Sequence, residues 1–149
     1  MNVNHARAAH ADGGWGDVPE TNRAVVLLLE DDESLRELYT VELEEAGYAV
    51  EATGSGEETL ERLGGGLKPD ALVLDIKLEG IDGIEVARRA LTHHPETAII
   101  LHSAYEMYKR DFAAWCADAY VVKSTRQGAL TRTLAEVLGR RAAGEEKAG

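Results

Sequence analysis

Cysteine, long apolar runs and basic residues are all scarce in this sequence. One cysteine among 149 residues, Cys116, cannot form an intrachain disulfide. No unbroken apolar run is longer than that at residues 24–29, whereas a membrane-spanning helix needs about 20 such residues. The first 23 residues contain no apolar stretch of the kind found in signal peptides. We therefore expect a cytoplasmic protein without a membrane segment.

Positive charge is the minority charge. Lysine and arginine number 16 against 27 aspartates and glutamates, which gives a net charge of −11. Such a chain repels nucleic-acid phosphates and anionic membranes unless a local basic patch opposes the overall field, and no such patch stands out in the sequence. Neither nucleic acid nor membrane is therefore an expected partner. The length suits one domain with a hydrophobic core.

The chain divides into a folded unit and two tails. Residues 1–23 lack a hydrophobic period and are interpreted as an N-terminal tail. The expected domain covers residues 24–138, and residues 139–149 carry charge, alanine and glycine as a C-terminal tail.

Inside the domain, short apolar runs alternate with amphipathic segments. Four runs are apolar on both faces, which is typical of parallel strands covered by helices on both sides, and residues 48–52 are more mixed, which suits a sheet edge. The predicted strands are residues 24–29, 48–52, 70–74, 97–101 and 119–122. Five strand–helix units predict a doubly wound α/β fold.

Helix start and stop signals lie between these runs. The candidate N-terminal caps are Asp32, Ser55, Asp82 and Ser124, and the last three have a glutamate or glutamine three residues later. Gly47 and Pro95 are the expected stops for the first and third helices. Residues 105–116 carry an aromatic stripe at helical spacing, which we interpret as the core face of a fourth helix.

Polar side chains follow four of the five strands. Glu30 and Asp31 come after the first strand, Asp75 after the third, and Lys123 after the fifth. His102 and Ser103 follow the fourth, where His102 is expected on the opposite face as a buried structural histidine. Ligands of open parallel sheets bind at the carboxyl ends of strands, so these groups should meet at one edge.

This set of groups suits phosphoryl transfer. Three carboxylates in one cleft repel each other unless a cation lies among them, and Mg²⁺ suits carboxylate oxygens while leaving coordination positions open. Lys123 and Ser103 would neutralise charge on a transferring phosphoryl group. Asp75, at the centre, is the candidate nucleophile that forms an acyl phosphate.

Four separated pieces, EDDESLR, LDIKLEGIDG, HSA and VVKS, occur in an order that resembles the response regulator receiver domain over residues 24–138. The resemblance implies a flavodoxin-like (βα)5 fold with a five-stranded parallel sheet in the order 2-1-3-4-5. It also implies a cofactor, Mg²⁺, and a histidine kinase or phosphotransfer protein as the phosphoryl donor.

The same resemblance implies a role for each matching residue. Asp75 would be the phosphoacceptor, Asp31 a direct Mg²⁺ ligand, and Glu30 a ligand through water. Lys77 would offer its backbone carbonyl to the metal. Ser103 would be the switch hydroxyl, Tyr120 the switch aromatic residue, and Lys123 the lysine that binds the phosphoryl group.

The sequence departs from the family pattern at several places. Ser124 stands where proline usually follows the lysine, and a cis bond before a non-proline residue costs about 3 kcal/mol, so we expect the Lys123–Ser124 peptide to be trans. Glu79 replaces a frequent proline and adds negative charge. The stretch from Ser103 to Tyr120 is about two residues short, and Trp115 and Cys116 replace a small residue and glycine. We hypothesise that the Lys77 ammonium offsets carboxylate repulsion.

The predicted function is that of a single-domain response regulator, which accepts a phosphoryl group on Asp75 and switches its contacts with a downstream protein. Its only catalysis would be its own phosphorylation and dephosphorylation. One alternative is a docking module that has lost phosphorylation, favoured by Glu79, Ser124 and the short fourth segment. A weaker alternative is a metal-dependent aspartyl-phosphate phosphatase, because such enzymes commonly place a second acid at the position of Lys77.

Overall fold

A five-stranded parallel sheet forms the centre of the computed structural model, which describes residues 23–76, 80–104, 117–123 and 128–144. The strand order β2-β1-β3-β4-β5 confirms the predicted doubly wound topology and places the mixed strand at an edge. The strands are β1 (Val25–Leu29), β2 (Ala49–Thr53), β3 (Ala71–Leu74), β4 (Ala98–Ser103) and β5 (Ala119–Val122). The described helices are α2 (Glu33–Glu45), α3 (Gly56–Gly64), α4 (Gly83–His93) and α5 (Ala129–Ala142). The helix predicted at residues 105–116 lies outside the described residues.

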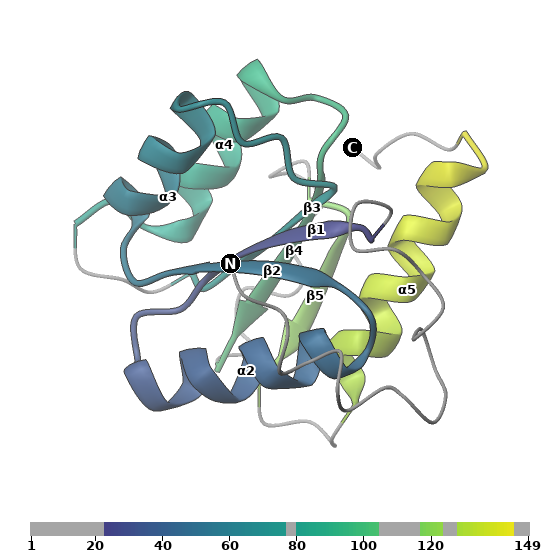
Figure 1. Cartoon of the computed structure of the whole chain (residues 1–149). Coiled ribbons are helices and arrows are strands. Elements are labelled where there is room, and N and C mark those ends of the chain that lie inside the picture. The colour runs from purple at the N-terminus through teal and green to yellow at the C-terminus, as the bar shows by residue number, and fades with distance from the viewer. Residues whose placement is uncertain (1–22, 77–79, 105–116, 124–127, 145–149) are drawn as a thin grey trace.

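Helices cover both faces of the sheet. Figure 1 shows α3 and α4 together on one side, and α2 and α5 on the other. The alternation of strand side chains produces two cores. Leu27 and Leu29 pack with residues of α3 and α4, whereas Val26 and Leu28 pack with residues of α2 and α5. Both faces of the central strands are therefore buried, which explains their continuous apolar sequences.

Three predicted caps are confirmed. Asp32 accepts a hydrogen bond from the amide of Leu35 at 2.9 Å, and Ser55 and Asp82 accept equivalent bonds at the starts of α3 and α4. The predicted cap at Ser124 is wrong, because α5 begins at Ala129 with Gly128 at its N-cap. Gly128 has a φ of 89°, a left-handed conformation that glycine adopts readily and that a right-handed helix cannot contain.

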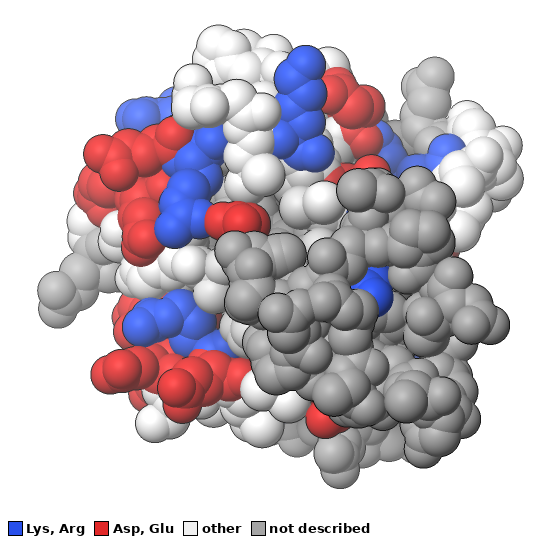
Figure 2. Space-filling model, viewed as in Figure 1, with Lys and Arg blue, Asp and Glu red and all other residues white. Residues whose placement is uncertain are grey.

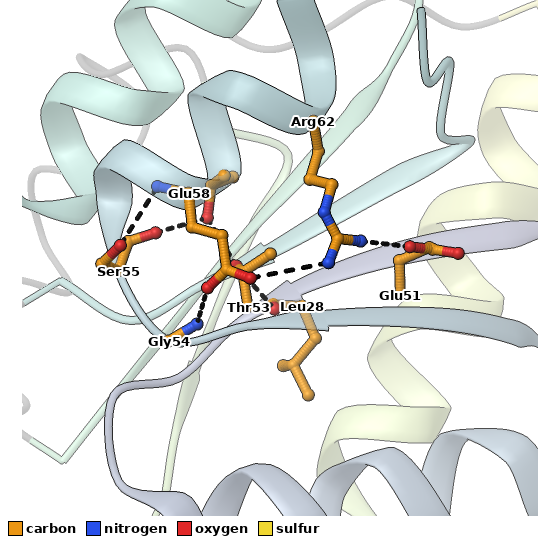
Figure 3. Close-up of polar contacts among 8 residues, drawn as sticks. Leu28, Glu51, Thr53, Gly54, Ser55, Glu58 and Arg62 are labelled. Carbon is orange, nitrogen blue, oxygen red and sulfur yellow. Dashed lines mark hydrogen bonds and ion pairs between the residues drawn. The ribbon is translucent and has the colours of Figure 1, made fainter. Parts of the chain in front are cut away.

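The turn from β2 into α3 is held by a network of side chains (Figure 3). The amide of Gly54 donates to Glu58 Oε1 at 3.0 Å. In a capping box, Glu58 would instead accept from the amide of the N-cap residue Ser55, so the bond lies one residue earlier than predicted. Arg62 pairs with Glu58, and also with Glu51 on β2. This network lies where β2 stops pairing with β1, since Leu29 and Thr53 are the last paired residues.

The C-terminal helix continues to Ala142, past the expected domain end at residue 138. Arg141 lies in the last turn of this helix and extends to the edge of the sheet that is formed by the amino ends of the strands. Its Nη2 donates to the carbonyls of Pro95 and Glu96 at 3.2 and 2.7 Å, and its Nη1 lies 3.4 Å from Asp118 Oδ1. These contacts join α5 to the segments that precede β4 and β5.

Arg141→Ala should lower the free energy of unfolding by about 1–3 kcal/mol, because it removes charge-assisted hydrogen bonds from a partly buried carboxylate and two carbonyls. Urea unfolding measures the change. Arg132→Ala is the matched control, because Arg132 is an exposed arginine of the same helix and should change stability by less than about 0.5 kcal/mol. Equal effects of the two substitutions would contradict this account.

Candidate functional site

The carboxyl ends of four neighbouring strands bring the predicted side chains to one edge of the sheet. Glu30 directly follows β1, Asp75 follows β3, Ser103 ends β4, and Lys123 follows β5. Main-chain hydrogen bonds hold these strand ends together, since the Asp75 amide donates to Leu29 at 3.0 Å and the Lys123 amide donates to Ser103 at 2.7 Å. The parallel order of the strands therefore positions residues that lie far apart in the sequence.

One lysine ammonium lies between two buried carboxylates. Lys123 Nζ is 2.6 Å from Glu30 Oε1 and 3.0 Å from Asp75 Oδ2. The side chains of Glu30 and Asp75 are only 2% and 8% exposed. Glu30 Oε2 also accepts a hydrogen bond from the Asp32 amide at 3.1 Å. The predicted contact among the ends of the first, third and fifth strands is thus present, because the Lys123 ammonium pairs with both carboxylates.

The three predicted acids form a cluster that suits a hard divalent cation. Glu30, Asp31 and Asp75 each offer a carboxylate oxygen, and these oxygens lie within 4.8 Å of one another. Glu30 and Asp75 are buried, whereas Asp31 is exposed. An all-carboxylate donor set with one open side fits Mg²⁺, which retains several water ligands when it binds protein.

Electrostatics at the site act mainly through burial. The pKa of Asp75 is raised to about 6. Burial is the largest cause, the charge and hydrogen bond of the Lys123 ammonium oppose it, and the charges of Glu30 and Asp31 add to the rise. For Lys123, burial lowers the pKa, but the hydrogen bonds and charges of Glu30 and Asp75 outweigh it, so the net shift is upward. The ammonium is therefore retained, while Asp75 takes up a proton more readily than an exposed aspartate.

Ser103 and Tyr120 lie on neighbouring strands beneath this edge. Ser103 is fully buried at the end of β4, where it pairs with Val122 of β5. Tyr120 is 9% exposed and lies in the core on the α3 and α4 side. Their roles as switch residues stay predictions. Lys77, Glu79, Trp115, Cys116 and Ser124 lie outside the described residues, and with them the predictions for the Lys77 carbonyl and ammonium and for the Lys123–Ser124 peptide.

His102 lies on the other face of β4, as predicted. Its ring centroid is 4.7 Å from that of Tyr39 on α2, in an edge-to-face arrangement with an interplanar angle of 68°. Burial and the Lys123 charge lower the pKa of His102 to about 3, so the imidazole is neutral. Both features support a structural histidine rather than a ligand of the acidic cluster.

Arg36 is a side chain near the site that the sequence did not single out. Its Nη1 donates to the backbone carbonyl of Glu30 at 2.9 Å. The contact comes from the first turns of α2, which follow the acidic pair directly. Arg36 ends the segment EDDESLR, but nothing in that segment assigned it a role. Its partner is a backbone carbonyl, which is available because β2 ends nearby.

Comparisons with known proteins agree with the fold and the site. A family model described as the response regulator receiver domain matches residues 26–135. The transcriptional regulatory protein AfsQ1 of Streptomyces coelicolor is 36% identical over 118 residues, which cover 77% of this chain and 51% of AfsQ1. The positive alginate biosynthesis regulatory protein of Pseudomonas aeruginosa is 32% identical over 112 residues, covering 73% of this chain and 45% of that protein.

Solved structures give the same result. The response regulator TrrA of Thermotoga maritima, crystallised in complex with Mg²⁺-BeF, is 36% identical with a TM-score of 0.71, and the match covers 76% of this chain and 98% of TrrA. A CheY-like receiver domain from Methanospirillum hungatei has a TM-score of 0.76 at 23% identity, covering 83% of this chain and 100% of that one, and supports the fold alone.

The fold and its carboxyl edge define a doubly wound α/β protein with a metal-compatible acidic cluster. The chain belongs to the response regulator receiver domain family, whose members act in two-component signalling. It spans about half the length of the curated relatives it matches. No helix in the described part of the chain has the length and apolar character needed to cross a membrane. On the face drawn in Figure 2, the described basic and acidic side chains are interspersed.

The raised pKa of Asp75 predicts a specific effect of pH on stability. With its pKa near 6, folded Asp75 binds a proton that the unfolded chain, with a pKa near 4, has already released. Between about pH 4 and 6 the folded state thus binds more protons, so in EDTA this group makes stability fall as pH rises. Asp75→Asn should remove this effect. Relative to the parent protein, the free energy of unfolding of the variant should therefore be about 2 kcal/mol more favourable to the folded state at pH 7.5 than at pH 4.5.

Urea unfolding of both proteins at the two pH values measures this difference, because the titrations of groups outside the site are shared by the two proteins. Asp82→Asn is the matched control, since Asp82 lies outside the acidic cluster and asparagine also caps helices. If the variant and the parent protein differ in unfolding free energy by the same amount at pH 4.5 and at pH 7.5, Asp75 has an ordinary pKa and the prediction is contradicted.

Lys123→Met should raise the affinity for Mg²⁺ by about tenfold, because it removes a positive charge in contact with two of the three acids. Calorimetric titration at pH 8 measures the affinity, because a high pH favours the ionised carboxylates that bind the metal. Lys68→Met is the control, since Lys68 is an exposed lysine outside the site. Weaker Mg²⁺ binding by Lys123→Met would contradict the competition between ammonium and metal.

Proposed function

We propose that this chain is a phosphorylation-dependent switch that accepts a phosphoryl group on Asp75 from a phosphohistidine of a histidine kinase or phosphotransfer protein. The observation that carries the proposal is the shared position of Lys123 between Glu30 and Asp75, with the Asp31 carboxylate beside them. An acceptor carboxylate, an acidic metal cluster and a fixed ammonium are the groups that phosphoryl transfer to aspartate needs.

In the proposed step, a carboxylate oxygen of Asp75 attacks phosphorus and forms an acyl phosphate. The phosphorus–nitrogen bond of the donor breaks, and the imidazole nitrogen keeps the electron pair. Lys123 remains near the phosphoryl oxygens and balances their charge, and the Ser103 hydroxyl donates a hydrogen bond to one of them. With a pKa of about 6, Asp75 is mainly ionised at neutral pH, and this ionised form is the nucleophile.

Mg²⁺ is the cofactor in this proposal. It would be held by Asp31 and Asp75 directly, by Glu30 through water and by the backbone carbonyl of Lys77, and it would supply positive charge to the phosphoryl oxygens. The chemistry of the donor set supports this assignment, since all three clustered side chains are carboxylates. The Mg²⁺-BeF complex of TrrA, a relative at 36% identity, supports it as well.

The proposed output is a change of protein contacts. Once the phosphoryl group is in place, Ser103 moves toward it and Tyr120 repacks, so the population shifts to a second conformation. We propose that a downstream protein in the cytoplasm recognises that conformation. The complex of TrrA with the histidine kinase ThkA supports a kinase as the upstream partner.

Acetyl phosphate with Mg²⁺ should add one phosphoryl group, because a small acyl phosphate can replace the protein donor. Intact-protein mass spectrometry measures the adduct. It should be absent in Asp75→Asn, absent with excess EDTA, and present in Asp82→Asn, which retains the acceptor.

An adduct in Asp75→Asn would place the acceptor elsewhere. Failure of the unmodified chain to form an adduct would favour a docking module without phosphorylation. Sustained hydrolysis of small phosphate esters would favour a phosphatase.

A further inference from the structure

The arginine of α2 that contacts the end of β1 has a position suited to controlling the metal site. Arg36 Nη1 donates to the Glu30 carbonyl at 2.9 Å, and this carbonyl belongs to the peptide bond that leads into Asp31. Arg36 itself is partly buried, and α2 begins only three residues after Glu30. The contact therefore closes a short loop between the end of β1 and the helix that follows.

The carbonyl of Glu30 is available because the β1–β2 ladder stops here. The Glu30 amide still donates to Thr53 at 3.1 Å, but β2 ends at Thr53 and the chain turns into α3. In a parallel ladder, the amide and carbonyl of one residue face the same neighbouring strand, so the Glu30 carbonyl faces the place where β2 has ended. The Arg36 guanidinium supplies the missing donor.

Gly54 makes room for this guanidinium. A Cβ atom at Gly54 would lie only 2.9 Å from Arg36 Nη1, which is closer than such contacts normally allow. The network in Figure 3 holds Gly54 in place through its hydrogen bond to Glu58. The ends of β1 and β2 and the start of α2 thus lie beside the partly buried arginine head group.

The Asp31 carboxylate depends on this backbone for its position. Among the described residues, its side chain has neither a hydrogen bond nor an ion pair that would orient it, and it is exposed. Glu30, by contrast, is held by Lys123 and by the Asp32 amide. Asp31 nevertheless belongs to the acidic cluster, so the direction of its side chain follows from the orientation of the Glu30–Asp31 peptide.

We propose that Arg36 is a positioning residue for Mg²⁺, which fixes the Glu30–Asp31 peptide and thereby keeps the Asp31 carboxylate directed at the metal. The inference rests on the proposed Mg²⁺ site. The proposal predicts the direction in which Mg²⁺ affinity changes when Arg36 is removed. A nearby cation that acted only through its charge would repel Mg²⁺, so removing it would tighten binding, whereas removing a positioning residue weakens binding.

The test compares Mg²⁺ affinities by calorimetry, without a phosphoryl donor. Arg36→Met removes both the charge and the donor, and should weaken binding about fivefold. Arg36→Lys keeps a positive charge and one donor, and should recover part of the loss. Arg88→Met, which removes an exposed guanidinium on α4, should leave the affinity unchanged.

A double-mutant cycle with Asp31→Asn separates positioning from a general loss of structure. If Arg36 acts through Asp31, then Arg36→Met has no further effect once Asp31 is replaced. Urea unfolding in EDTA checks that each variant is folded, and Arg36→Gln, which retains an amide donor, replaces Arg36→Met if the latter does not fold.

Unchanged or tighter binding by a folded variant without the guanidinium would overturn the proposal. An equal loss in the presence and absence of the Asp31 carboxylate would overturn it too. Failure of the unmodified protein to bind Mg²⁺ would refute the metal site itself, and is seen before any variant is compared.

Discussion

The structure at the carboxyl edge depends on one ammonium group shared by two buried carboxylates. Without Lys123, Glu30 and Asp75 would face each other as unpaired charges in a nearly dry environment, which proteins avoid by protonation or by binding a cation. The ammonium therefore has two consequences. It allows the acidic cluster to exist without metal, and in the proposed reaction it remains beside Asp75 when the phosphoryl group is transferred. The same contact links stability, metal affinity and the proposed chemistry.

The rest of the fold serves to bring these three residues together. Each lies at the end of a different strand, and only a parallel sheet aligns those ends at one edge. The two cores on opposite faces of the sheet hold the strands in register, so the strand ends that carry these residues keep their positions relative to one another. Arg36 adds a local constraint at the point where the β1–β2 ladder ends. The acidic cluster is thus buried at Glu30 and Asp75 and exposed at Asp31.

Much of this arrangement is predictable from the sequence, for identifiable reasons. Buried parallel strands are recognisable because both faces are apolar, and Asp75 and Lys123 stand out because charged residues follow such runs. Ser124 misled the prediction of the last helix because its capping pattern is local, whereas the left-handed Gly128 sets the actual start. The contact of Arg36 was not predictable, since its carbonyl partner is free only because β2 turns away in three dimensions.

A crystal structure of the protein with Mn²⁺ in place of Mg²⁺, analysed by anomalous diffraction, tests the central claim most directly. The account predicts an anomalous peak between the carboxylates of Asp31 and Asp75, with the Lys123 ammonium still in contact with Glu30. A peak elsewhere, or a Lys123 side chain directed into solvent with the two buried acids separated, would contradict it.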